Sequence, residues 1–226
     1  MSDNDVQKKQ RDNVLLTIIG VLLFAFACVG LFYNKISTPR VLSEKELRNN
    51  GAIVFEKPRI FGDVSLTDHN GEPFDSDRLK GKWSILLFGF TFCPDICPTA
   101  LAQLNSMVEP LSEEELADLQ VVMISVDPER DTSEVLSQYV PYFNESFTGV
   151  TGNPHFIRKL AAELNVAYNK VPLEATEHRE ATYTMDHSAH LVLVNPYGHY
   201  HGFFRHPQDP TEMRLTWRSI RESFKG

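Results

Sequence analysis

The longest apolar stretch of the chain lies near its N-terminus, where the twenty residues from Val14 to Tyr33 carry no charge. At about 1.5 Å per residue, a helix of this length crosses a hydrocarbon core about 30 Å thick. A buried core helix rarely stays apolar on every face for so long, so the pattern predicts one transmembrane helix over residues 14–33. A cleaved signal peptide is the alternative, but it has a shorter apolar core and a small-x-small cleavage site, which this stretch lacks in clear form.

Basic residues flank the apolar stretch unequally. Lys8, Lys9 and Arg11 precede it closely, whereas basic residues follow it more sparsely. The positive-inside rule therefore places the N-terminal tail in the cytoplasm and the body of the protein on the other side of the membrane. We predict a cytoplasmic tail (1–13), an anchor in the inner (cytoplasmic) membrane (14–33), a linker (34–58) and one periplasmic domain (59–226).

Residues 34–58 are polar and contain two prolines, which is typical of a linker. Within this segment, Ser43 and Glu46 have the spacing of a capping box ahead of Gly51, which predicts one or two helical turns. The segment is expected to join the membrane anchor to the folded domain.

Strand and helix patterns alternate through the rest of the chain. The predicted elements are, in order, a hairpin over 64–74, a buried strand over 84–90, a helix over 98–111, a strand over 119–126, a helix after Asp131, a helix over 154–164, a strand over 189–194 with its hairpin mate over 200–204, and a helix from 210. Asp131 is interpreted as a helix N-cap, because Glu134 comes three residues later. This order predicts one α/β domain, with an N-terminal β-hairpin extension, a mixed sheet and helices on both faces.

The acidic composition argues against nucleic acid as a partner. The chain carries a net charge of −8 at pH 7, whereas nonspecific binding to phosphate backbones depends on Lys and Arg side chains that release counterions. Three cysteines are an odd number, so a closed disulfide framework is not expected to stabilise the fold. Any cysteine chemistry must therefore be local.

Two of the cysteines, Cys93 and Cys97, lie four residues apart between the first buried strand and its helix. A helix N-terminus lowers the pKa of a thiol, and a thiolate pair supports either a reversible disulfide or coordination of a soft metal such as Cu(I). Thioredoxin-like reductases prefer two intervening residues, and the three found here give a wider loop. Spacing alone leaves redox chemistry and metal binding open. Cys28 lies in the predicted anchor and is interpreted as a packing residue without chemistry.

A third ligand is expected from the histidines near the C-terminus. His187 is the best candidate, because it immediately precedes a strand that the fold places beside the first buried strand. Asp186 or another carboxylate is expected to orient its second ring nitrogen. His199 and His201 lie two apart in a predicted strand, where a weak accessory metal site is conceivable but a solvated face is the favoured interpretation.

Three segments together carry a family resemblance, namely residues 88–98 with both cysteines, residues 125–132 and residues 186–189. In this order and spacing they closely resemble the SCO/SenC family of copper proteins, over roughly residues 50–226. The resemblance implies a thioredoxin-like fold tethered to the membrane. It also implies copper, as Cu(I), Cu(II) or both, bound by Cys93, Cys97 and His187, and a structural or supporting role for Asp127 and Arg130.

The function implied by the resemblance is delivery of copper to the dinuclear copper centre of cytochrome c oxidase subunit II, with another copper chaperone as a candidate donor. This describes a metallochaperone rather than an enzyme. The alternative is a thiol-disulfide oxidoreductase that keeps the oxidase cysteines reduced through the Cys93–Cys97 disulfide, and only the copper chaperone needs His187. A peroxiredoxin-like peroxidase ranks last, because Leu87 stands where its motif has proline and Cys93 follows Thr91 by two residues instead of three.

Overall fold

The computed structural model describes residues 3–37, 40–174 and 182–224. These residues separate into two compact units, a smaller one that contains the first helix and the residues from Arg221 onward, and a larger one over Leu42–Ile220. The first helix, α1 (Asp3–Ser37), contains the apolar segment Leu15–Phe32, which has a mean hydropathy of 2.7 and buries none of its residues. Its length and composition fit the predicted membrane anchor.

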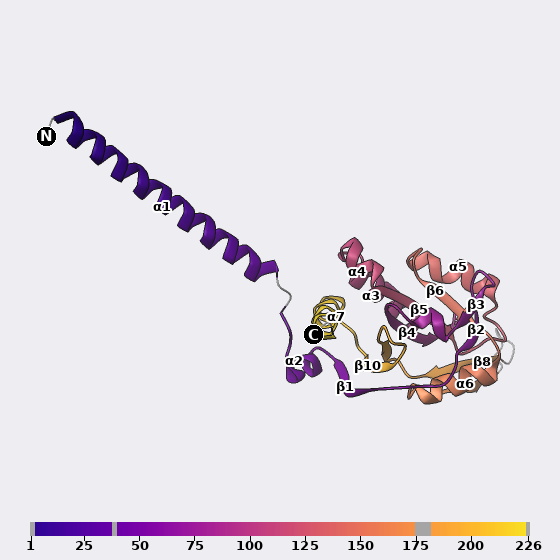
Figure 1. The fold of residues 1–226 in the computed structure, drawn as a ribbon. Coiled ribbons are helices and arrows are strands. Elements are labelled where there is room, and N and C mark those ends of the chain that lie inside the picture. The colour runs from indigo at the N-terminus through magenta and orange to yellow at the C-terminus, as the bar shows by residue number, and fades with distance from the viewer. Residues whose placement is uncertain (1–2, 38–39, 175–181, 225–226) are drawn as a thin grey trace. The chain divides into compact units, whose positions relative to one another are not determined.

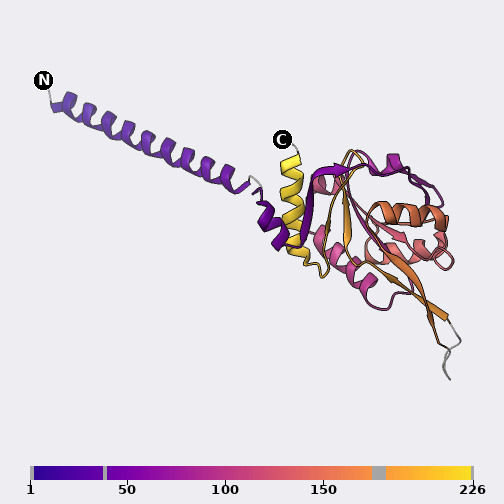
Figure 2. The ribbon, with the colours of Figure 1, turned by 90° about the horizontal axis from the view of Figure 1, so that it is seen from below.

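The larger unit is built on an eight-stranded mixed sheet (Figure 1). Its strands are β1 (Ala52–Arg59), β2 (Ser65–Asp68), β3 (Pro73–Asp75), β4 (Trp83–Gly89), β5 (Leu119–Ser125), β6 (Thr148–Thr151), β9 (Leu191–Val194) and β10 (Tyr200–Phe204). They lie in the order β1-β10-β9-β4-β5-β6-β2-β3. Two further strands, β7 (Tyr168–Leu173) and β8 (Thr182–His187), form a separate two-stranded ribbon that extends away from the sheet (Figure 2).

Helices cover both faces of the sheet, as the sequence predicts. They are α2 (Glu44–Asn49), α3 (Ile96–Val108), α4 (Glu113–Ala117), α5 (Ser133–Phe143), α6 (Pro154–Glu163) and α7 (Pro210–Phe224), together with a 3₁₀ turn over Ser76–Leu79. Figure 1 shows α3 and α5 on one side of the sheet and α6 on the other. The side chains of α6 join those of β4, β5 and β9 in one hydrophobic cluster.

The centre of the sheet explains where the cysteines lie. All seven residues of β4 are buried, because both faces of this strand are covered. β4 pairs in parallel with β5 and antiparallel with β9, so the strand after residue 187 does lie beside the first buried strand, as predicted. The carboxyl ends of β4 and β5 consequently meet at one edge, where the chain turns into α3.

The interpretation of residues 34–58 as a simple linker missed a strand. The capping box of Ser43 and Glu46 is confirmed at α2, but β1 follows it and pairs with β10 at the edge of the sheet. An edge strand needs no continuous apolar run and tolerates a proline such as Pro58, which is why its sequence pattern resembles a linker.

The predicted N-cap at Asp131 is wrong. Thr132 caps α5, since its side chain accepts a hydrogen bond from the amide of Val135. The carboxylate of Asp131 is fully buried and faces the interior, where Thr91 and Ser125 donate hydrogen bonds to it. The local sequence pattern assigns this carboxylate to the helix N-terminus, but hydrogen bonds in the interior hold it there instead.

Candidate metal centre

The two cysteines of the larger unit lie at the junction of β4 and α3. Cys93 is partly buried in the loop, and Cys97, with no exposed surface, is the second residue of α3. The amide of Cys97 points at Cys93 Sγ, 3.4 Å away. Cys93 therefore faces the positive end of the helix, as predicted from the strand-to-helix position.

A glycine makes room for the buried sulfur. A Cβ atom built on Gly89, the last residue of β4, would lie 2.8 Å from Cys97 Sγ, which is closer than real contacts allow. The absence of a side chain at this position lets Cys97 pack directly against the end of the strand. Sequence reasoning missed this role, because nothing in the local pattern distinguishes Gly89 from other glycines in strands.

His187 reaches the cysteines from the end of β8. Its Nε2 lies 3.3 Å from Cys97 Sγ, and its ring packs edge-on against Phe90 with centroids 5.9 Å apart. Its Nδ1 lies 3.2 Å from the carbonyl oxygen of Ser188. A proton on Nδ1 donated to this carbonyl leaves the lone pair of Nε2 directed at the sulfurs, which is the form that binds metal.

The expectation that Asp186 orients the histidine is not met. The Asp186 side chain is exposed, and the backbone carbonyl of Ser188 takes the orienting position instead. Neighbouring side chains alternate between the two faces of a strand, so Asp186 points away from the face that carries His187.

The ligand atoms of Cys93, Cys97 and His187 all lie within 4.8 Å of one another, and they are the single such group found among the described residues. With metal–ligand bonds of about 2.0–2.3 Å, as for thiolate and imidazole ligands of zinc, three donors around one ion stand about 4 Å apart. The donor set therefore fits one ion. Two soft thiolates suit Cu(I), and the imidazole also suits Cu(II).

The thiol groups differ in their affinity for protons. A hydrogen bond from the Cys97 thiol, and then the contacts with His187 and the backbone amides, lower the pKa of Cys93 to about 3 despite its partial burial. The same pairing with Cys93, together with burial, raises the pKa of Cys97 above its ordinary value. The metal-free pair is thus one thiolate and one thiol, and binding of an ion by both sulfurs releases the Cys97 proton.

Asp127 and Arg130 lie beside the site without joining the ligand atoms. They form an ion pair with each other, and both contact Tyr183 on β8. The structural or supporting role of these two residues remains an expectation from the resemblance, and these are the contacts through which it would act.

His199 and His201 are not part of the group of converging ligand atoms found among the described residues. Only His201 lies in β10, where it is buried and packs edge-on against Trp83 with ring centroids 5.0 Å apart. Burial lowers the pKa of His201 to about 4, so this histidine is neutral at physiological pH. His199 precedes the strand and lies near Tyr197. The expected solvated face is therefore also wrong for His201, because tertiary packing covers it.

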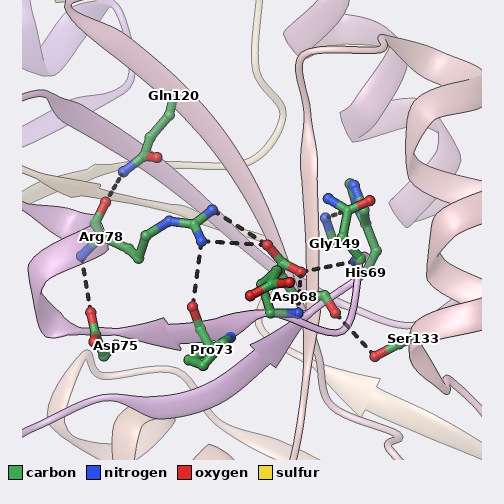
Figure 3. Close-up of polar contacts among 10 residues, drawn as sticks. Asp68, His69, Pro73, Asp75, Arg78, Gln120, Ser133 and Gly149 are labelled. Atoms are coloured by element: carbon green, nitrogen blue, oxygen red, sulfur yellow. Dashed lines mark hydrogen bonds and ion pairs between the residues drawn. The ribbon is translucent and has the colours of Figure 1, made fainter.

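A cavity of about 500 Å³ lies at the opposite end of the parallel strands, lined by residues that precede β4 and begin β5. Two of its cations are already paired. Arg78 donates to Asp68 at 3.4 Å (Figure 3), and Lys80 forms an ion pair with Asp77 at 2.7 Å. The groove beside the cysteines is smaller, about 220 Å³, and contains Cys93 and His187 in its lining. The chemistry of the site thus lies in the smaller groove.

Comparison with known proteins agrees with the geometry of this site. Residues 55–221 match the model of the SCO1/SenC family. A SCO2-like protein of Rickettsia prowazekii is 37% identical over 220 residues, which cover 96% of this chain and 99% of that protein. The copper-bound structure of Arabidopsis thaliana ScoI is 35% identical with a TM-score of 0.64, covering 72% of this chain and 99% of that one. Copper-bound ScoI of Bradyrhizobium japonicum is 33% identical with a TM-score of 0.62, covering 72% and 98%. These matches confirm the thioredoxin-like α/β fold.

Proposed function

The chain belongs to the SCO1/SenC family, and from this premise we propose that it is a membrane-tethered copper chaperone that loads the dinuclear copper centre of cytochrome c oxidase subunit II. The convergence of Cys93, Cys97 and His187 carries the proposal, because this donor set accepts copper in both oxidation states. Copper-bound relatives with the same fold support the choice of metal.

The depth of the ligands suggests how the cargo enters and leaves. Cys93 borders the groove of about 220 Å³, whereas Cys97 is completely buried. A donor chaperone or an acceptor reaches copper from the Cys93 side, and its own thiolates replace the chaperone's ligands one at a time. Loading releases the Cys97 proton, and transfer to the acceptor returns a proton to this thiol.

Oxidase assembly in cells that lack the native protein and grow with limiting copper tests the proposal. His187→Ala should lose assembly of the dinuclear copper centre, because copper binding is weakened although both cysteines can still form and break a disulfide. His199→Ala is the matched control, since this residue lies outside the donor set, and it should restore assembly. Full restoration by His187→Ala would show that copper binding at this site is dispensable.

The asymmetry of the two thiols favours a second candidate, reduction of the oxidase cysteines before they receive copper. The Cys93 thiolate would attack the disulfide of the acceptor and form a mixed disulfide, releasing one acceptor thiolate. Cys97, after losing its proton, would then attack Cys93, which frees the second acceptor thiolate and leaves a Cys93–Cys97 disulfide. This route needs both cysteines and a reductant that restores them, but no imidazole.

We also propose that residues 14–33 remain as an anchor in the inner membrane, with residues 1–13 in the cytoplasm and the domain over 59–226 in the periplasm. The excess of Lys and Arg before the apolar segment supports this orientation. A reporter enzyme that is active only outside the cytoplasm should be active when fused after Gly226. Activity of a cytoplasm-only reporter at the same position would overturn the orientation.

A further inference from the structure

His187 lies at the end of β8, a strand that in the described part of the chain does not pair with the main sheet. Within the described residues, β8 forms its ladder with β7 alone, where His187 is paired with Tyr168. The cysteines, in contrast, follow the central strand β4. Besides the short chain link through residues 188–190 to β9, the distance between the imidazole and the sulfurs therefore depends on side-chain contacts.

One of these contacts comes from Arg130, in the turn after β5. Its Nη1 donates a hydrogen bond of 3.2 Å to the carbonyl oxygen of Tyr183, and its guanidinium carbon lies 3.9 Å from the centre of the Tyr183 ring. The hydroxyl of Tyr183 donates to Asp127 at 2.9 Å, and Arg130 donates to the same carboxylate. Asp127, Arg130 and Tyr183 thus form a closed ring of contacts.

This ring acts on the face of β8 that carries the ligand. Tyr183, Met185 and His187 are two residues apart and share one face of the strand. Met185 is buried in the hydrophobic cluster, and the His187 ring contacts Phe90. Arg130 itself lies 4.8 Å from the centre of the Phe92 ring, next to Cys93. The arginine therefore lies between the strand of the histidine and the loop of the cysteines.

The next residue of the same turn holds the cysteine loop. Asp131 accepts hydrogen bonds from the amide of Thr91 at 3.0 Å and from its hydroxyl at 2.6 Å, two residues before Cys93. The turn is itself closed, because the amides of Arg130 and Asp131 both donate to the carbonyl of Asp127. Residues of one short turn consequently contact both halves of the site, namely the cysteine loop and the strand that carries His187.

We propose that the turn Asp127–Asp131 positions the two halves of the copper site, with Arg130 holding the histidine strand and Asp131 holding the cysteine loop. This inference rests on the proposed function, since copper is the ion that the halves share. Removal of the contacts between the Arg130 side chain and β8 loosens His187 and leaves the thiolates in place. Two thiolates suffice for Cu(I), whereas Cu(II) depends on the imidazole, so the affinity for Cu(II) falls more than that for Cu(I).

The test compares Arg130→Gln with the wild type, as full chains in detergent. Competition with chelators specific for Cu(I) and for Cu(II) gives both affinities. Loss of a residue that supports a ligand typically weakens metal binding about 10–100-fold, and we expect this loss for Cu(II) with a change of less than about threefold for Cu(I). Each tenfold loss of Cu(II) affinity relative to Cu(I) affinity raises the reduction potential of the bound copper by about 59 mV.

Two further variants separate positioning from general damage. Tyr183→Phe keeps the ring but loses the hydroxyl that donates to Asp127, and it should shift the two affinities in the same direction by a smaller factor. Arg158→Gln is the matched control, because Arg158 lies over Tyr168 on β7, 5.1 Å from the ring centre, and does not touch β8 in the contacts described. It should leave both affinities unchanged.

A readout without metal completes the test. In the metal-free Arg130→Gln protein, amide hydrogen exchange should accelerate in β8 and stay unchanged in β4. Equal losses of Cu(I) and Cu(II) affinity, or an unchanged Cu(II) affinity, would overturn the positioning role. A wild-type chain that binds neither ion would instead refute the proposed function, so the two failures are distinguishable.

Discussion

The two halves of the copper site are built in opposite ways. The cysteine loop follows β4, a strand whose residues are all buried, and Cys97 packs against Gly89 without exposed surface. His187 stands at the end of β8, in a two-stranded ribbon outside the main sheet. The thiolates thus follow a core strand of the domain directly, while the imidazole is held near them by the short link to β9 and by side-chain contacts.

This difference assigns separate tasks to the two halves. The cysteine half supplies the soft ligands that any bound copper needs, and the core fixes their separation. The histidine half adds the imidazole, a ligand on which Cu(II) binding depends more strongly than Cu(I) binding. Changes in the first half should therefore affect every copper species, whereas changes in the second half should depend on the oxidation state.

The largest effect is expected from Cys97→Ser. A hydroxyl is a poor ligand for a soft ion, so tight binding of both Cu(I) and Cu(II) should be abolished. Copper per chain after gel filtration of the loaded full-length protein measures this loss. Cys28→Ser, which changes an exposed cysteine of α1, is the control and should retain one copper per chain. If Cys97→Ser still bound copper tightly, Cys97 would not be a copper ligand.

The next effect is expected from His187→Ala, which removes the ligand of the second half. Cu(II) affinity should fall about 100-fold or more and Cu(I) affinity less, because the thiolates remain. Chelator competition measures both values. His201→Ala should instead lower the free energy of unfolding without changing either affinity, since this ring packs against Trp83. If His201→Ala released the copper and His187→Ala did not, the third ligand would be wrong.

A smaller effect on copper is expected from Gly89→Ala, because the new methyl group displaces Cys97. Crowding of a packed interior costs about 1–3 kcal/mol of unfolding free energy, and the shifted ligand should weaken Cu(I) binding about tenfold. Gly149→Ala is a matched control on β6, where a Cβ would lie 3.0 Å from Leu136 and Val140. It should destabilise the fold in chemical denaturation but leave copper affinity intact. Equal copper losses in both variants would mean that the core does not position Cys97 specifically.

The smallest change concerns the pH dependence of Cys93 in the metal-free protein. Because its pKa is lowered to about 3, Cys93 is a thiolate throughout the neutral range and should lose reactivity only as the pH falls toward that value. The alkylation rate with iodoacetamide should consequently be nearly the same at pH 5 and pH 8. An ordinary thiol with a pKa near 8.5 would react several hundred-fold more slowly at pH 5. Such a decline would contradict the electrostatic description of the pair.

The cysteine half was open to prediction from sequence for a physical reason. A strand covered on both faces must be continuously apolar, so β4 and β5 are visible in the sequence, and Cys93 and Cys97 follow one of them directly. His187 was also found, because it precedes a strand that pairs with β4. The order of the strands along the chain therefore predicts that the three residues lie together.

The support of the histidine half does not follow from the residue pattern, and only the resemblance implies a supporting role for Asp127 and Arg130. The residues of β7 are mostly exposed, so no hydrophobic periodicity reveals this strand of the ribbon. Arg130 and Tyr183 are 53 positions apart in the chain, so their contact leaves no local signal. Asp131 fits the local pattern of an N-cap, and only the tertiary structure turns its carboxylate inward to Thr91. Long-range polar contacts are the part of this fold that local propensity does not encode.

X-ray absorption spectroscopy of the Cu(I)-loaded full-length protein tests the central claim most directly, because it counts the ligands of the ion. The account predicts one copper per chain with two sulfur ligands and one nitrogen ligand. The nitrogen should disappear in His187→Ala, and one sulfur should disappear in any copper retained by Cys93→Ser. Copper bound through nitrogen and oxygen alone, or an unchanged ligand count in both variants, would contradict the assignment of this site.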